Sequence, residues 1–569
     1  MRIWHWVIAA FLLLTLSTNA QQSANSSSPK ATGRTPVSAA LPTMEQVVDR
    51  AIQREHALME MLKTHTPIVE TYLQDLKFDP QMGPVPVQDH YYLGRMDLDE
   101  SVDRRDYLSE DTSFERHLLG GFKRLYKLEY KPMGFSWMIY ADRDGFNRQI
   151  YDFKYVQREF LGDVRCIVFE VSAKKGTGNG RFRGRIWVED QDYNIVRLNG
   201  TYEPQPHNAY FFHLDSWRLN LIPGYWVPAY IYSEEGDFGY RSKDKVAFKA
   251  QTRLWGYDLQ KSAQGGELTK LLVDSTIKDE SPAEQDASPL QAQWHWQQQA
   301  ADNVIERLQN AGLLAPEGEV DKVLETVANN LLITNNIELP SPVRTRVMLT
   351  APLETFSVGS TIVVSRGLLD VLPDEACLAM VLSHELAHIV LGHNLGTRYA
   401  FYDRMLFSDE SIYQNLGFRH VPAEETAADK KALDLLKNSP YAQKLDTPGL
   451  FLRELAARGP ALPALLTPHL GDGFTRKGAV HRMVELMNSA PALDPNKLAQ
   501  IAALPLGGRV KLNAWDNRAE LTKTTPMPIT SARSKMPLEV TPFFPRLTRY
   551  LTVVDATGSV NAANPTPNK

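Results

Sequence analysis

Residues 381–394, VLSHELAHIVLGHN, place two histidines and a glutamate within five consecutive positions of an apolar segment. His384 and His388 are four residues apart, so on a helix they lie one turn apart on the same face. This is the geometry in which two imidazoles bind one tetrahedral zinc ion. Burying these polar groups without a shared partner would cost several kcal/mol, and a metal ion removes that cost by coordinating both rings. The stretch therefore predicts a zinc-binding helix; two satisfied histidines on a buried helix face are the alternative.

The predicted helix begins after Asp374, whose carboxylate can accept hydrogen bonds from the amides of the first turn, and covers residues 375 to about 392. Glu385 lies one step around the same turn as His384. There it can reach a metal-bound water without being a ligand itself. His393 follows nine residues after His384, about half a turn away in angle. We therefore expect His393 to point elsewhere, as a residue of the helix end.

A second helical segment, AEETAADKKALDLL at 423–436, supplies carboxylates for this site. Catalytic zinc usually takes three protein ligands and leaves one position for water. Glu425 and Asp429 are four residues apart and share a helix face, so one can bind the metal while the other supports a ligand from behind. Alone, this pair would be an ordinary solvated helix face. Together with the two histidines, it predicts a complete metal site.

The sequence STIVVSRGLLDVLPDEACLAMVLSHELAHIVLGH at 360–393, followed by EETAAD at 424–429, resembles the HtpX-like and CAAX-prenyl-endopeptidase family of zinc metallopeptidases. The resemblance covers roughly residues 315–490. It implies that the first Glu of the E-x-x-A-D pattern, here Glu425, is the third ligand. It also implies that the Asp of that pattern, here Asp429, supports the site.

These ligands predict a hydrolytic mechanism with one zinc ion per chain. Zinc held by His384, His388 and Glu425 would lower the pKa of its bound water toward ~7. Glu385 would act as general base while the water attacks a peptide carbonyl, and would then deliver the proton to the leaving amine. The strand just before the zinc helix could pair with an extended substrate by β-addition. That strand consists of Ser360, Thr361, Ile362, Val363, Val364 and Ser365.

The residue that stabilises the transition-state oxyanion is not assigned by the resemblance. The family usually has His-Pro upstream of an Arg in its last helix, whereas Arg476 and Lys477 stand at that place before Arg482. The candidates for this role are His469, Arg476, His481 and Arg482.

Upstream of the metal site, residues 85–275 contain short aromatic and β-branched runs separated by turn signals, which predicts an antiparallel β-domain. The apolar stripe from residue 44 to about 76 suits a preceding helix. One helix followed by a curved sheet, with RIWVEDQDYNIVRLNGTY at 185–202, resembles the half-barrel of lipoprotein-sorting proteins. The expected fold is multidomain α+β: an N-terminal antiparallel β-domain followed by a mainly α-helical, zincin-like metallopeptidase domain.

The chain of 569 residues is too long for one hydrophobic core. We expect these segments: a signal peptide at 1–20, a linker at 21–40, the helix plus β-domain at 41–278, a linker at 279–293, the zinc metallopeptidase domain at 294–490, a C-terminal extension at 491–555 and a disordered tail at 556–569.

The first residues predict export. Arg2 precedes an apolar run at 6–16 and then small residues before position 21. A membrane anchor is the alternative, but about eleven apolar residues fall short of the ~20 that span a bilayer. We therefore expect a periplasmic or secreted mature chain without a transmembrane span. A net charge of −5 without a dense basic cluster excludes a nucleic-acid partner. Cys166 and Cys377 fall in different predicted domains, so no disulfide framework is expected.

Together these features predict an exported zinc endopeptidase whose substrates are peptides or unfolded or misassembled envelope proteins, with a partner in envelope assembly. The alternative is a non-catalytic envelope binding or chaperone factor that uses its β-domain and keeps a structural or vestigial zinc site. An enzyme that stays latent until a partner uncovers its site is a milder variant. Glu385 favours the enzyme, because a structural zinc site has no use for an unligated carboxylate beside its water position.

Overall fold

A computed structural model describes residues 42–562, apart from the segments 97–103, 107–137, 204–211, 236–246, 258–288, 394–416, 523–528, 532–537 and 555–559 and some shorter gaps. The predicted signal peptide, the first linker and most of the predicted linker 279–293 lie outside the described residues. Within the described part, no helix is both long and apolar enough to cross a bilayer.

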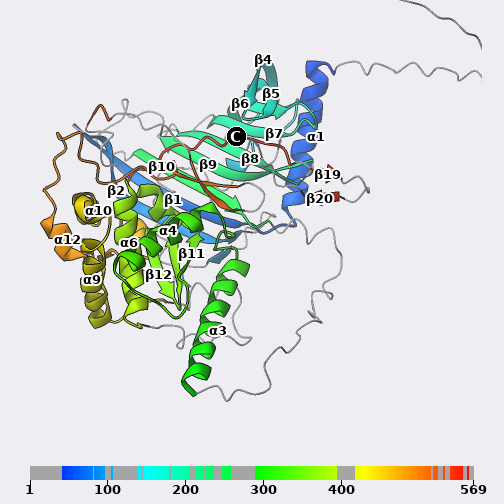
Figure 1. The fold of residues 1–569 in the computed structure, drawn as a ribbon. Helices are drawn as coiled ribbons and strands as arrows, with labels where there is room; N and C mark the ends of the chain where they lie inside the picture. Colours follow the sequence, from blue (N-terminus) through cyan, green and yellow to red (C-terminus); the bar gives the residue numbers. More distant parts are fainter. Residues whose placement is uncertain are drawn as a thin grey trace, which may run out of the picture. The chain divides into compact units, whose positions relative to one another are not determined.

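The N-terminal half forms a ten-stranded antiparallel sheet, which confirms the expected β-domain (Figure 1). Neighbouring strands follow the order β3-β2-β1-β10-β9-β8-β7-β6-β5-β4, and the edge strands β3 and β4 do not pair with each other in the described residues. Gly162 and Gly224, with φ of +66° and +77°, allow two of the tight turns. The strands are β1 (Ile68–Asp79), β2 (Gly83–Met96), β3 (Arg104–Asp106), β4 (Tyr151–Leu161), β5 (Val164–Ala173), β6 (Arg181–Glu189), β7 (Ile195–Glu203), β8 (Phe212–Ile222), β9 (Tyr225–Glu235) and β10 (Ala247–Trp255).

Helix α1 (Met44–Leu62) packs against one face of this sheet and shares a core with it. The expectation of a helix up to about residue 76 was wrong. Pro67 cannot continue a helix and disfavours helical backbone at the residue before it. The β-branched and aromatic residues that follow form β1, which begins at Ile68.

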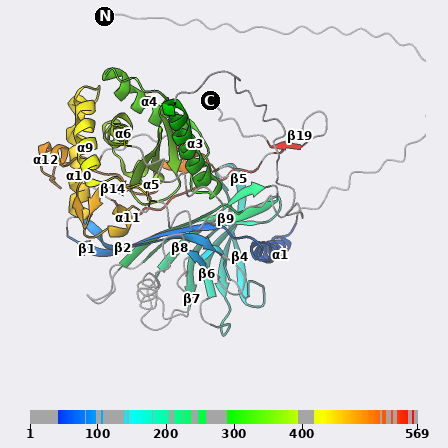
Figure 2. The ribbon, with the colours of Figure 1, turned by 90° about the horizontal axis from the view of Figure 1, so that it is seen from below.

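The opposite face of the sheet shares a second core with the region after residue 289 (Figure 2). Helix α3 begins at Pro289, inside the predicted linker 279–293. The elements around the metal-binding motif are α3 (Pro289–Asn310), α4 (Glu319–Thr334), α5 (Arg366–Val371), α6 (Glu375–Val390), α9 (Pro422–Lys437), η3 (Ala442–Lys444), α10 (Asp446–Arg458), α11 (Pro463–Leu466) and α12 (Val484–Ser489). This mainly helical region confirms the second half of the expected fold class.

A small sheet lies among these helices, in the order β11-β13-β12-β14. Strand β13 (Thr361–Ser365) pairs in parallel with β11 (Arg344–Met348) and antiparallel with β12 (Glu354–Val358), and β12 also pairs with β14 (Asp472–Gly473). The expectation that residues 360–365 offer a free edge to substrate was therefore wrong, because both edges of β13 are already hydrogen-bonded. That prediction missed the parallel pairing with β11.

The described residues from Met44 onward belong to one compact unit. The amides of Ala464 and Leu465 donate to Asp89 on β2, at 2.9 and 2.8 Å, and so tie the start of α11 to the large sheet. The C-terminal extension is attached to the same sheet, since the amide of Val540 donates to Gln74 Oε1 on β1 at 2.9 Å.

The remaining strands of the described residues are six short ones that form three antiparallel pairs: β15 (Thr475–Arg476) with β16 (Ala479–Val480), β17 (Val510–Leu512) with β18 (Ala519–Leu521), and β19 (Thr552–Val554) with β20 (Val560–Ala562). Strand β20 pairs with β19 and lies inside the predicted disordered tail. The composition of the tail did not indicate this strand, because its partner β19 lies before the tail and consists of β-branched residues, which favour strands.

Candidate metal centre

Helix α6 carries the histidine motif through the interior of the helical region. Asp374 caps it as predicted, with its carboxylate accepting from the amide of Cys377 at 2.9 Å. Its residues 376–388 are buried apart from a half-buried Leu378, because α4, α9 and α10 pack around it together with β12 and β13. A helix that is apolar on nearly every side fits such a central place.

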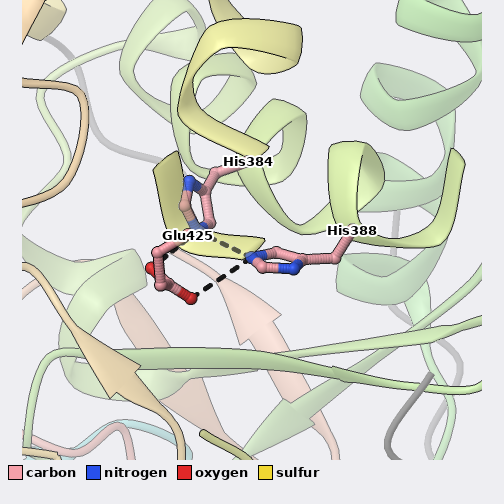
Figure 3. Close-up of side chains that lie close together, drawn as sticks. All are labelled: His384, His388 and Glu425. Atoms are coloured by element: carbon pink, nitrogen blue, oxygen red, sulfur yellow. Dashed lines mark hydrogen bonds and ion pairs between the residues drawn. The ribbon is translucent and has the colours of Figure 1, made fainter. Parts of the chain in front are cut away.

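The structure brings His384, His388 and Glu425 together (Figure 3). One donor atom from each residue lies within 4.8 Å of the other two. His384 Nε2 is 3.4 Å from Glu425 Oε2, His388 Nε2 is 3.3 Å from Glu425 Oε1, and the two Nε2 atoms are 3.2 Å apart. Three donors therefore face one point between α6 and α9.

The bonding of these donors fits a metal ion. Both carboxylate oxygens of Glu425 are buried without a hydrogen-bond partner, an arrangement that is costly unless a cation binds there. Burial opposes the ionisation of Glu425, but the charge of Arg482 and the two histidines outweigh it and hold the pKa of this carboxyl below its usual range. Burial lowers the pKa of His388 to about 4, so this ring is neutral at pH 7, as a metal ligand must be.

Helix α9 presents Glu425 and Asp429 to α6 from one face. Ala428 and Ala432 are fully buried in this helix, and their small side chains allow close approach to α6. Asp429 Oδ1 lies 2.9 Å from His384 Nδ1, and its Oδ2 accepts from the amide of Met483 at 2.8 Å. Asp429 thus fixes the ring of His384 from behind, where we expected a supporting carboxylate.

Glu385 is 1% exposed and lies beside the trio. Its Oε1 is 3.2 Å from Arg482 Nη1, and Arg482 Nε is 3.5 Å from Glu425 Oε2. Arg482, itself 2% exposed, therefore contacts the proposed base and a proposed ligand.

The other oxyanion candidates are placed differently. Arg476 pairs with Asp472 at 3.5 Å and is about half-exposed. Burial lowers the pKa of His481 to about 4, and its amide donates to the carbonyl of Phe474. His469 lies outside the described residues.

Two further histidines lie at this centre: His420, which we did not predict there, and His393, which we expected to point elsewhere. His420 stacks on His388 with ring centroids 3.7 Å apart, and no motif signals it. The expectation that His393 points elsewhere was wrong, since its Nδ1 lies 3.0 Å from Nδ1 of His388. Gly392 has φ +71° and turns the chain back at the end of the helix. This glycine was the available signal, because it is typical of such helix ends.

Residues 315–445 match the model of peptidase family M48. This segment is an M48 peptidase domain. The match includes the residues that converge on α6 and α9, and it supports a metallopeptidase activity. Membership of the HtpX-like branch stays a prediction.

Solved structures similar to the chain include a putative outer membrane lipoprotein-sorting protein domain from Vibrio parahaemolyticus, at 9% identity over 36% of this chain and 91% of that chain, with a TM-score of 0.20. A LolA superfamily protein from Nitrosomonas europaea matches at 11% identity over 37% and 91%, with a TM-score of 0.19. Such low TM-scores do not establish a shared fold, so the half-barrel shape stays a prediction. No curated protein matches the chain.

Proposed function

We propose that the M48 domain is a zinc endopeptidase in which His384, His388 and Glu425 hold the metal and Glu385 is the general base. The observation that carries this proposal is the buried Glu385 carboxylate next to a His-His-Glu donor set. Structural zinc sites are closed by four protein ligands, whereas catalytic sites use three and keep one position open. Three donors with an unligated carboxylate beside them favour the catalytic type.

Each side chain has a separate task in this proposal. Bound zinc supplies Lewis acidity, which polarises a carbonyl and makes water a better nucleophile at neutral pH. Glu385 takes the proton from the attacking water and passes it to the leaving amine. Arg482 orients the Glu385 carboxylate through its contact with Oε1. Asp429 accepts the Nδ1 proton of His384, which leaves Nε2 of that ring for the metal.

The proposed substrates are protein chains in an exported compartment, unfolded or misassembled envelope proteins among them. The signal-like residues 1–20 support this setting. Because His384, Glu385 and His388 are at most 2% exposed, a peptide reaches them only after a local movement. This burial favours an enzyme that is latent until a partner or substrate opens the site.

Zinc content and cleavage of denatured casein, measured together for wild type and Glu385→Gln, test the proposal. We expect about one zinc per chain in both proteins and a fall in cleavage rate of about 10²–10⁴-fold in the variant, the range of general acid–base catalysis. Glu375→Gln is the matched control, since Glu375 is an exposed carboxylate at the start of the same helix.

Each other outcome has a definite meaning. A zinc-loaded wild type that cleaves no unfolded protein or peptide would support the non-catalytic binding factor. Cleavage that survives Glu385→Gln unchanged would remove Glu385 from the role of general base.

A further inference from the structure

The two histidines on α6 differ in what contacts the ring nitrogen that faces away from the donor set. A metal-bound histidine almost always donates its second ring N–H to a carboxylate, a backbone carbonyl or water, and this partner fixes the ring and its tautomer. For His384 the partner is the carboxylate of Asp429. For His388 the position is taken by another imidazole, that of His393, with 3.0 Å between the two Nδ1 atoms.

The end of α6 builds this contact. The cap residue is Leu391, and Gly392 then adopts φ +71°, which a residue with a side chain adopts only under strain. The chain turns back, and the amide of His393 donates to the carbonyl of His388 at 2.9 Å. His393 is therefore fixed to His388 twice, once through the backbone and once through the ring.

The chemistry of the two rings decides which one donates. His388 Nε2 faces Glu425 and His384 at 3.3 and 3.2 Å, so this nitrogen must be free of a proton for the ring to be a ligand. The neutral ring then carries its proton on Nδ1. Two N–H groups cannot point at each other, so Nδ1 of His393 is the acceptor and His393 carries its own proton on Nε2.

We propose that His393 is a positioning residue that holds His388 in its metal-binding tautomer by accepting the Nδ1 proton. The assignment rests on the proposed zinc site and adds to it a role for a residue outside the donor set. His420 stacks on the face of the His388 ring, while its Nδ1 contacts Glu424 at 3.2 Å. His420 therefore restrains the plane of the ring, and His393 sets its tautomer.

A pair of isosteric substitutions tests this role in the full chain. In His393→Asn the side-chain carbonyl can take the place of the acceptor nitrogen. In His393→Leu the side chain has nearly the same shape as that of Asn but carries no acceptor. We expect the zinc dissociation constant, measured by competition with a chelating dye at fixed pH, to rise about 10–100-fold in the Leu variant and to stay within about threefold of wild type in the Asn variant. His56→Phe, at an exposed position of α1, controls for the loss of a histidine.

Two further measurements separate metal binding from folding. The thermal midpoint of the metal-free chain should be the same for wild type and both His393 variants, and the visible spectrum of the cobalt-loaded chain should change in the Leu variant only. If the Leu variant does not fold, His393→Ala replaces it in the same titration.

The possible results are distinguishable. A Leu variant that binds zinc as tightly as wild type overturns the role of His393 and leaves the proposed enzyme intact. An Asn variant as weak as the Leu variant also overturns it, because the acceptor would then not be the feature that matters. A wild type that takes up no zinc overturns the proposed function itself.

Discussion

Two buried arginine–glutamate pairs in this chain differ sharply in geometry. Between α1 and β8, Arg218 binds both carboxylate oxygens of Glu55, at 2.6 and 2.7 Å, and also donates to two backbone carbonyls. At the metal centre, the contact between Arg482 and Glu425 is 3.5 Å long, and neither carboxylate oxygen of Glu425 has a hydrogen-bond partner.

The difference shows that burial of charge does not by itself mark a functional site. In the bidentate pair each oxygen of the Glu55 carboxylate already accepts a short, charge-assisted hydrogen bond from Arg218, so neither oxygen is left without a cationic partner. The second pair keeps two buried oxygen atoms aimed at two imidazoles, and those atoms are available to a cation. We therefore expect the first pair to stabilise the fold and the second to bind metal.

The largest effect should come from Glu425→Gln. Because the amide is a much poorer metal ligand than the carboxylate, we expect cleavage to fall to background. Zinc affinity should fall by more than the ~10–100-fold that follows the loss of a supporting hydrogen bond. A chelator-competition titration measures the affinity. In urea unfolding of the metal-free protein, Glu425→Gln should lower the free energy of unfolding by less than Glu55→Gln does. If Glu425→Gln binds zinc as tightly as wild type, Glu425 is not a ligand.

The next effect concerns the other pair. Glu55→Gln leaves Arg218 buried without its counter-charge, and removing one partner of a buried pair typically lowers the free energy of unfolding by about 3–5 kcal/mol. Urea unfolding followed by circular dichroism measures the loss, and Glu60→Gln, on the same helix and exposed, is the control. Zinc affinity should not change. A destabilisation similar to that of the control would show that the pair contributes little to the fold.

The sequence predicted the parts of the metal centre that depend on local spacing. His384, His388 and the Asp374 cap follow from helical geometry, and Glu425 and Asp429 share a face for the same reason. The arginine that contacts Glu55 is 163 residues away in the chain, and no local pattern links positions so distant. The position of β13 inside the small sheet was not predicted for the same reason, since β13 pairs in parallel with β11, a separate segment of the chain. The contact between His393 and His388 was not predicted because it depends on the positive φ angle of Gly392, which turns the chain back after the helix.

The partners of the buried Asp89 carboxylate are intermediate between those of Glu55 and Glu425. Asp89 accepts hydrogen bonds, as Glu55 does, but no arginine of the described residues pairs with both of its oxygens. Burial raises the pKa of this carboxyl to about 6, although the amides of Ala464 and Leu465 and the hydroxyl of Tyr72 act against the rise. The folded chain thus binds this proton more tightly than the unfolded chain, in which the pKa is near its ordinary value of 3.8.

The smallest effect should therefore appear in the pH dependence of Asp89→Asn. The stabilisation from the raised pKa of Asp89 is fully present below pH ~4 and is lost as the pH rises through ~6, a change of up to about 3 kcal/mol at 1.36 kcal/mol per pKa unit. The neutral Asn side chain does not titrate. The free energy of unfolding of wild type minus that of the variant should fall between pH 4.5 and pH 7 in urea titrations. A constant difference would mean that Asp89 stays ionised in the fold and that its two backbone donors suffice to hold a buried charge, as the guanidinium does for Glu55.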